Sequence, residues 1–170
     1  MDAGLLIARV ILGLAFASHG AQKLFGWFGG HGLTGTGGFF DGLGFRPGRL
    51  FAFAAGFGEL VGGLLTAAGL LWPIGPALII LVMVVAIVTV HVSHGFFAVS
   101  NGIELPLIYL TAALALAFAG AGAYSLDALL GVGRLFDAAT VWLLIALAVG
   151  LAFLSVGLRR LTPAVAGTRG

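Results

Sequence analysis

Seven ionisable residues lie inside long apolar stretches of this sequence, where charged side chains are uncommon. They are Arg9, His19, Lys23, Glu59, His91, His94 and Glu104. A charged side chain at the centre of a bilayer costs roughly 2.5–3.5 kcal/mol on insertion scales, so such residues usually face the interior of a helix bundle and mark a functional site. Imidazole, ammonium and carboxylate groups together can relay protons and bind a polar head group through hydrogen bonds. The sequence therefore predicts a buried polar site.

The helical rise places most of these residues near one membrane face. Counted at 1.5 Å per residue from the expected helix ends, all but Arg9 lie within about 14 Å of the same face. Arg9 enters from the opposite face, and its depth differs from that of Glu59 by ~6 Å, which two long side chains can bridge. We therefore expect a structural ion pair between Arg9 and Glu59. The other five residues are candidates for ligand binding or proton relay: His19, Lys23, His91, His94 and Glu104.

Structural roles remain open for several of these residues. Arg9 can extend to the opposite membrane surface, and Lys23 can anchor its helix at the interface. Glu104 follows Asn101 at the spacing of a helix capping box, where a carboxylate also suits the positive end of a helix. Asp127 is expected to cap a surface helix rather than to react. These alternatives would make the polar groups fix helices instead of binding a ligand.

Five apolar helices are expected to position these groups. Hydrophobic residues make up 61% of the 170 residues, charged residues 8%, and the mean hydropathy is +1.18. An ordinary soluble domain carries about 25% charged residues, so the composition excludes a soluble enzyme and a disordered chain. A transmembrane helix needs about 20 mainly apolar residues. The sequence thus predicts an all-α membrane protein, in which a four-helix transmembrane bundle is followed by a fifth, C-terminal transmembrane helix. The five spans are 3–26, 50–71, 74–97, 102–121 and 138–158.

The connections divide the chain into three parts. Residues 1–130 are expected to form the four-helix core, which includes a glycine-rich interfacial or re-entrant loop at 27–49 with aromatic anchors. Residues 131–160 contain the end of a surface segment and the fifth helix, and residues 161–170 are expected to be a flexible tail. The surface segment, 122–137, is expected to contain a short helix begun by Ser125. The three-residue link Trp72-Pro73-Ile74 predicts a tight antiparallel hairpin.

The basic residues predict an orientation in the membrane. The formal charge of +2 arises from only 8 basic and 6 acidic residues, which is too little for a nucleic-acid-binding surface. Basic residues favour the cytoplasmic side of a membrane protein. We therefore expect a multi-pass protein of the cytoplasmic membrane with its N-terminus outside and its C-terminus in the cytoplasm. The arginines that favour this orientation are Arg46, Arg49, Arg159, Arg160 and Arg169.

The polar residues are compatible with several kinds of ligand. The chain has no cysteine, which excludes a disulfide, a Cys-ligated zinc and an iron–sulfur cluster. His19, His91 and His94 offer a nitrogen-rich set for zinc or iron, and two facing histidines could ligate haem. A quinone or a similar amphiphile fits better, since its head group needs hydrogen-bonding groups below the interface and its tail needs an apolar, glycine-rich cleft. A phosphate-binding Gly-Lys-Ser/Thr motif is missing from the sequence.

Short motifs lie along residues 1 to about 130: Arg9-x-x-x-Gly13, His19-Gly20-x-x-Lys23-Leu24-Phe25-Gly26, Glu59-Leu60-x-Gly62-Gly63, Asn101-Gly102-x-Glu104 and Tyr124-Ser125-Leu126-Asp127. Together they resemble the DoxX family of small bacterial membrane proteins. The resemblance implies a four-helix transmembrane bundle and links the chain to quinone-coupled oxidoreduction and to membrane complexes that handle oxidative stress. It transfers no catalytic residue, and the fifth span departs from it.

These observations lead to one hypothesis and two alternatives. We expect a quinone-linked subunit of a membrane oxidoreductase complex, with the lipid bilayer around it and other membrane subunits against its fifth helix. The first alternative is a non-catalytic assembly or scaffold subunit whose buried charges only hold the helices together. The second is a transporter of small molecules or lipids, although the sequence shows no evident inverted repeat.

Overall fold

The computed structural model of this protein describes residues 2–133 and 137–159. In this part of the chain the secondary structure is helical and contains no β-strand, which confirms the all-α class. The expected tail and the arginines Arg160 and Arg169 lie outside these residues. The helices are α1 (Asp2–Phe25), α2 (Gly32–Gly42), α3 (Gly48–Ala68), α4 (Ile74–Ala86), α5 (Glu104–Ala119), α6 (Leu126–Leu130) and α7 (Ala138–Gly157), with the short 3₁₀ or π segments η1 (Trp27–Gly29), η2 (Ile87–His91), η3 (Val92–His94) and η4 (Ala98–Ser100).

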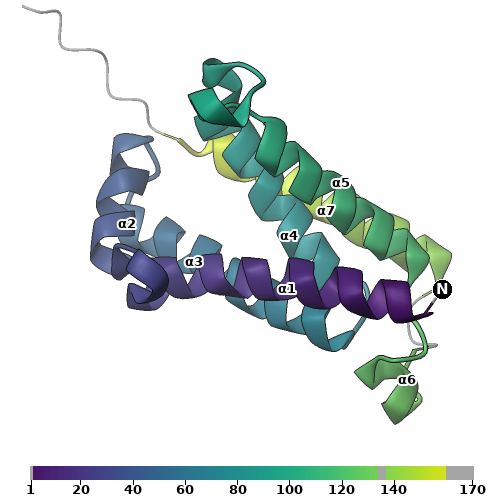
Figure 1. Ribbon diagram of the computed structural model, residues 1–170. Helices are drawn as coiled ribbons and strands as arrows, with labels where there is room; N and C mark the ends of the chain where they lie inside the picture. Colours follow the sequence, from purple (N-terminus) through teal and green to yellow (C-terminus); the bar gives the residue numbers. More distant parts are fainter. Residues whose placement is uncertain (1, 134–136, 160–170) are drawn as a thin grey trace, which may run out of the picture.

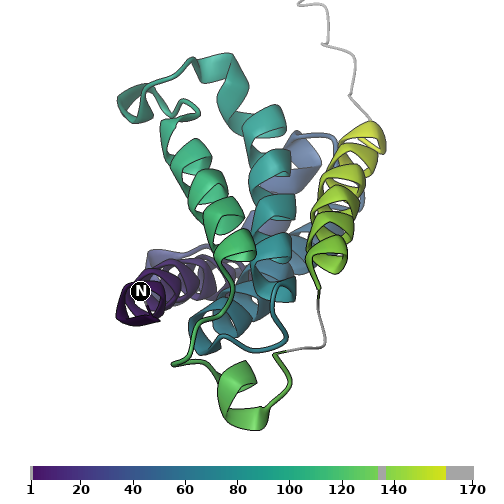
Figure 2. The same ribbon diagram turned by 90° about the vertical axis from the view of Figure 1, so that its right-hand side faces the viewer.

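The long helices form two groups that share α4. Helices α1 and α3 run antiparallel side by side, and α2 packs across the end where they are connected (Figure 1). Helix α4 contacts α3 on one side and both α5 and α7 on the other. The α1–α3 pair is strongly inclined to the group of α4, α5 and α7, as the two views show (Figures 1 and 2). The groups therefore diverge towards one end of the molecule.

The two ends of the molecule differ in what they carry. We call one the loop end; it holds α2, the connection 95–103 and the C-terminal end of α7 (Figure 2). The other we call the hairpin end; it holds the start of α1, the turn 69–73 between α3 and α4, and the surface helix α6 (Figures 1 and 2). The predicted antiparallel hairpin around Trp72-Pro73-Ile74 is confirmed, since α3 and α4 pack together on either side of it.

Four described helical segments are long and apolar enough to cross a membrane: Asp2–Phe25, Gly48–Ala68, Ile74–His94 and Ala138–Gly157. The expected span 102–121 is a shorter helix. Helix α5 has 16 residues, or about 24 Å at 1.5 Å per residue. It begins late because the Ile103 N–H bonds the Gly95 carbonyl in the preceding loop, and it ends at Gly120, whose φ is +87°. The predicted length of this span was therefore wrong, although its position among the helices is as expected.

Glycines bring α1 and α3 into backbone contact. A methyl group at Gly13 would overlap the backbone of α3 at Gly63, and one at Gly20 would overlap it at Gly56. Small residues at a helix interface allow this close approach in membrane proteins. The contacts fix the antiparallel register of the two helices, and this register decides which polar residues can meet.

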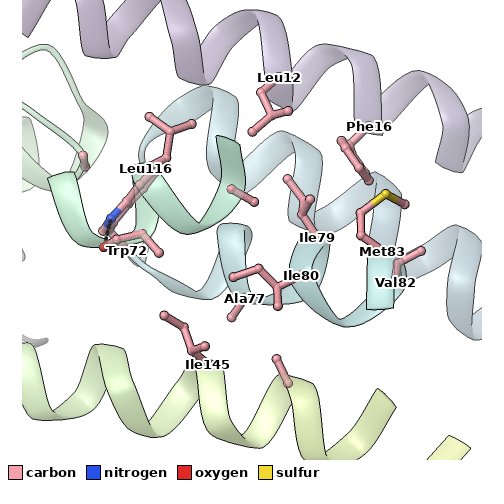
Figure 3. Packing of buried hydrophobic residues seen from close by; sticks show 14 residues of the cluster. Leu12, Phe16, Trp72, Ala77, Ile79, Ile80, Val82, Met83, Leu116 and Ile145 are labelled. Carbon is pink, nitrogen blue, oxygen red and sulfur yellow. Dashed lines mark hydrogen bonds between the residues drawn. The ribbon is translucent and has the colours of Figure 1, made fainter. Parts of the chain in front are cut away.

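The apolar core surrounds α4. Ile79 and Ile80 are completely buried between α1, α5 and α7 (Figure 3). Phe16 of α1 is likewise buried, and Ile145 of α7 belongs to the same cluster (Figure 3). The outward sides of the long helices carry exposed apolar side chains, which suits a surface that faces lipid. The fifth predicted span is thus packed into the core and is not a detached anchor.

The glycine-rich segment 27–49 contains a helix where an irregular loop was expected. Helix α2 packs against α3, and the Asp41 carboxylate accepts the Gly48 N–H at 2.8 Å at the start of α3. Gly37 and Gly48 are buried in this contact. The aromatic side chains of Trp27 and Phe39 are exposed, in keeping with the expected interfacial anchors.

Candidate functional site

A cavity of about 700 Å³ lies at the loop end, where the two helix groups diverge. Side chains of α1, α2, α3, α4, η2, α5 and α7 line it. Its wall is mainly apolar, and its volume is in the range typical of small-molecule sites. Its polar lining residues include His19, Lys23, Glu59, His91 and Tyr109. The site therefore combines a large apolar chamber with a few hydrogen-bonding groups.

Lys23 of α1 and Glu59 of α3 form an ion pair on the wall of this cavity. The Lys23 Nζ lies 2.9 Å from Glu59 Oε1 and 2.7 Å from Oε2. The Glu59 side chain is 4% exposed and the Lys23 side chain 26%. An ammonium group has three N–H donors, so the pair leaves one donor of Lys23 for a further acceptor.

The predicted pair between Arg9 and Glu59 is wrong. Arg9 is 1% exposed, but its guanidinium lies at the hairpin end and bonds main-chain oxygens. Its Nη1 donates to the Ala67 carbonyl at 3.3 Å, and its Nη2 donates to the Tyr124 carbonyl. The contact register of α1 and α3 explains the difference, because it brings Lys23 beside Glu59 and leaves Arg9 beside the end of α3.

Two of the predicted histidines line the cavity. His19 is exposed and its Nδ1 lies 3.0 Å from Gln22 Oε1, so it stands at the cavity rim. The Nδ1 of His91 lies 2.8 Å from the Asn101 carbonyl. A carbonyl can only accept, so Nδ1 of His91 carries the proton and Nε2 is the nitrogen left for a ligand. His91 belongs to the π segment η2, and such segments are frequent at functional sites.

Tyr109 of α5 is a lining residue that the sequence analysis missed. Its ring packs edge-to-face on Phe16 with the centroids 5.4 Å apart, and Phe16 contacts the His19 ring in the same way at 6.3 Å. Phe16 thus separates and orients the two polar rings. The available signal was the phenol itself, since a hydroxyl in an otherwise apolar span usually finds a partner.

The remaining two candidates do not line the cavity. His94 is exposed, with its Nδ1 2.7 Å from the Val90 carbonyl of its own helical turn. The Glu104 Oε2 accepts the Ala98 N–H at 2.8 Å and so holds the 95–103 connection. The expected capping box with Asn101 does not form, because Asn101 adopts a left-handed conformation three residues before the helix and Ile103 is the N-cap. Both residues are therefore better explained by structural roles.

The alternative metal set is also not assembled. In residues 2–133 and 137–159, no group of three His, Asp or Glu side chains is arranged to hold a metal ion. His19 is on α1 and bonds Gln22, whereas His94 bonds its own turn beyond the cavity. The three histidines proposed from the sequence therefore do not converge.

A comparison with protein families identifies the chain. The model of the DoxX family matches residues 4–92, just over half of the sequence. The chain belongs to the DoxX family. It is an integral, multi-pass membrane protein of this family, since the match coincides with the apolar helices α1, α3 and α4. No curated protein and no solved structure matches it.

The DoxX match divides the site into two parts. It contains Lys23, Glu59 and His91, together with the close contact of α1 and α3. Tyr109 and the lining residues of α7 lie beyond it. The cavity of this DoxX protein is therefore built jointly by the matched region and by the C-terminal helices.

Proposed function

We propose that this DoxX protein binds a quinone-like amphiphile and acts as a quinone-linked subunit of a membrane oxidoreductase complex. One observation carries the proposal: an apolar cavity of about 700 Å³ has a Lys–Glu pair, two histidines and a tyrosine on its wall. An apolar chamber with a few orienting polar groups is the usual form of a site for a small ligand. A quinone matches it with a flat ring, two carbonyl acceptors and an apolar tail.

Each polar side chain of the cavity is given a role in binding or protonating the quinone. The free donor of Lys23 and the phenol of Tyr109 can each donate to a quinone carbonyl. Reduction of a quinone to a quinol takes up two electrons and two protons. In the proposed complex a redox subunit of another chain supplies the electrons. His19 and His91 each deliver one proton to a quinone oxygen as an imidazolium, His91 from its Nε2, and each becomes a neutral imidazole. This protein thus binds and protonates the quinone, while the partner subunit transfers electrons to it.

We further propose that the loop end faces the cytoplasm. Arg159 at the end of α7 contacts residues of the α2–α3 connection, so it lies at the same end as Arg46 and Arg49. Basic residues are enriched on the cytoplasmic side. The N-terminal end of α1 would then lie outside.

The test is quinone binding in nanodiscs, measured by calorimetry with a decyl-substituted benzoquinone. Tyr109→Phe retains the ring that packs on Phe16, and His91→Gln retains a donor for the Asn101 carbonyl, so the double variant should fold. Losing one hydrogen bond at each residue should raise the Kd about tenfold or more. The matched control is Tyr124→Phe with His94→Gln, because neither side chain lines the cavity. Equal quinone affinity in the wild type, the double variant and the control would refute the proposal.

The rival function is a non-catalytic assembly subunit. In that case the wild-type protein binds no quinone, and the variants that disturb Lys23 or Glu59 lose only stability and complex assembly. Pull-down of partner subunits should be unaffected by the Tyr109→Phe/His91→Gln change for either function, so quinone binding is the measurement that separates the two. A quinone-induced rise in Tm that the double variant lacks would favour the proposed function instead.

A further inference from the structure

Helix α7 lies outside the region that matches the DoxX family, yet it contributes to the cavity. Leu151 and Ser155 both line it. On the adjoining part of the same face, Ala148 and Ala152 are buried and α7 packs on α4. These contacts hold the helix at a defined distance from the rest of the wall. The position of α7 therefore helps to set the width of the cavity.

Arg159, directly after α7, reaches across to the opposite wall. Its Nε donates to the Leu43 carbonyl at 2.9 Å. Its guanidinium carbon lies 5.7 Å from the centroid of the Phe45 ring, a distance at which a cation and an aromatic ring attract each other. Leu43 and Phe45 are both lining residues of the cavity. One side chain thus connects the end of α7 to the connection between α2 and α3.

The contact of Arg159 extends through an aromatic cluster. Phe45 is 1% exposed, and its ring lies between those of Phe40 and Phe51, with centroid distances of 5.5 and 5.1 Å. All three rings line the cavity. We call Phe40, Phe45 and Phe51 the Phe45 cluster. A shift of Phe45 would move this wall as a unit, because aromatic rings in a packed cluster have little free space.

We propose that α7 forms the side wall of the ligand cavity and that Arg159 is a positioning residue that holds the Phe45 cluster against the apolar part of the ligand. This inference rests on the proposed function for the kind of ligand, a flat ring with an apolar tail. The tail lies between the Phe45 cluster and Leu151, and the ring lies towards Lys23 and Tyr109. Arg159 acts through Phe45 and touches no reacting atom.

The absence of cysteine from the chain allows a direct test. Ser155→Cys places a single thiol on the proposed wall, and Leu154→Cys places one on the neighbouring exposed position, where the leucine is 59% exposed. Both proteins are labelled in nanodiscs with a small, membrane-permeant maleimide. The thiol at position 155 should react several times more slowly than the thiol at 154. Decyl-substituted benzoquinone should slow the reaction further at 155 only.

The role of Arg159 is tested in the Ser155→Cys background. Arg159→Gln removes the contact with Phe45 and weakens the bond to Leu43, whereas Arg49→Gln removes an arginine at the same end that does not line the cavity. Loss of one hydrogen bond and one cation–π contact corresponds to about a tenfold change. Arg159→Gln should therefore speed labelling at 155 and raise the quinone Kd about tenfold at temperatures well below its Tm. Arg49→Gln should do neither.

The outcomes separate this inference from the proposed function. Equal labelling of 154 and 155, or labelling at 155 that is indifferent to Arg159→Gln, would overturn the role of α7 and Arg159 whatever the ligand is. Slow labelling at 155 that Arg159→Gln speeds, without any effect of quinone, would support the wall and its positioning residue and refute the quinone as occupant.

Discussion

The buried charged residues at the two ends of the molecule bond different kinds of partner. At the hairpin end, Arg9 and Asp127 bond main-chain groups and hold chain segments together. At the loop end, Lys23 and Glu59 bond each other beside a cavity, and the nearby rings of His91 and Tyr109 retain hydrogen-bonding capacity. A buried charge is therefore not in itself a sign of a binding site. What distinguishes a site is polar capacity that the fold leaves unused next to a space of suitable size.

The largest expected effect is at the hairpin end. Asp127 is 2% exposed, and its two carboxylate oxygens accept the N–H groups of Leu71 and Trp72, each at 2.8 Å. Asp127→Ala leaves the buried Trp72 N–H and the partly buried Leu71 N–H without partners, at about 1–3 kcal/mol each. We expect the free energy of unfolding to fall by about 3–5 kcal/mol, measured by thermal or denaturant unfolding in detergent, with quinone affinity unchanged in the folded fraction.

Asp2→Ala is the matched control for this prediction. Asp2 also accepts one main-chain N–H at the hairpin end, that of Ala123 at 3.0 Å, but it is exposed. Its loss should change the free energy of unfolding by less than about 1 kcal/mol. If both substitutions have the same small effect, the hairpin end is not the structural part of the molecule that its hydrogen bonds indicate.

The second effect is at the Lys23–Glu59 pair. Lys23→Met leaves the Glu59 carboxylate buried without its cation, and breaking a buried pair in this way costs about 3–5 kcal/mol, less where one partner is partly exposed as Lys23 is. We expect a loss of about 2–3 kcal/mol in unfolding free energy. The double variant Lys23→Met/Glu59→Gln removes the uncompensated charge and should recover most of it.

Quinone affinity, measured on the same Lys23 and Glu59 variants, distinguishes a loss of stability from a loss of ligand binding. The double variant should be stable but should bind quinone more weakly, because the free donor of Lys23 is lost. A double variant that is as unstable as Lys23→Met, or one that binds quinone as well as the wild type, would make the loop end no different from the hairpin end.

Much of the fold could be predicted from the sequence, but the partners of the charged residues could not be read from depth alone. Hydropathy predicted the helices, and the count of 1.5 Å per residue brought Lys23 and His91 to one end. Glu59 was assigned the wrong partner because depth does not fix the register of two helices. The signal was present: Gly13 and Gly20 are seven residues apart, as are Gly56 and Gly63. Matching Gly13 with Gly63 and Gly20 with Gly56 in antiparallel helices places Arg9 level with Ala67, whose carbonyl it bonds, and not with Glu59.

The shape and the wall of the cavity could not be predicted from the sequence. Its wall depends on the divergence of the two helix groups and on the return of α7 to the loop end, and neither follows from periodicity. Tyr109 and Ser155 meet the cavity only through this packing. Glu104, in contrast, was singled out because a carboxylate near an apolar span is unusual, and the structure uses it to hold a loop. Sequence patterns thus identified unusual residues but did not separate those with free capacity from those already bonded.

The smallest expected effect concerns the first turn of α7, where another carboxylate binds the main chain. Asp137 accepts both the hydroxyl and the N–H of Thr140, at 2.7 and 2.8 Å, and these hydrogen bonds lower the pKa of Asp137 below its ordinary value. A group whose pKa is lowered by folding contributes stability above its unfolded pKa and loses it as the pH falls through the lower, folded pKa.

Amide hydrogen exchange of residues 140–142 should therefore be slowed by the cap at neutral pH and should lose this protection in acid, after correction for intrinsic exchange. Asp137→Asn keeps a capping oxygen that does not titrate, so its protection should not change with pH. Because the carboxylate is exposed, the difference should be confined to this turn and should not reach Tyr109 or Ser155; a change in quinone affinity with Asp137→Asn would mean that the two ends of the molecule are coupled.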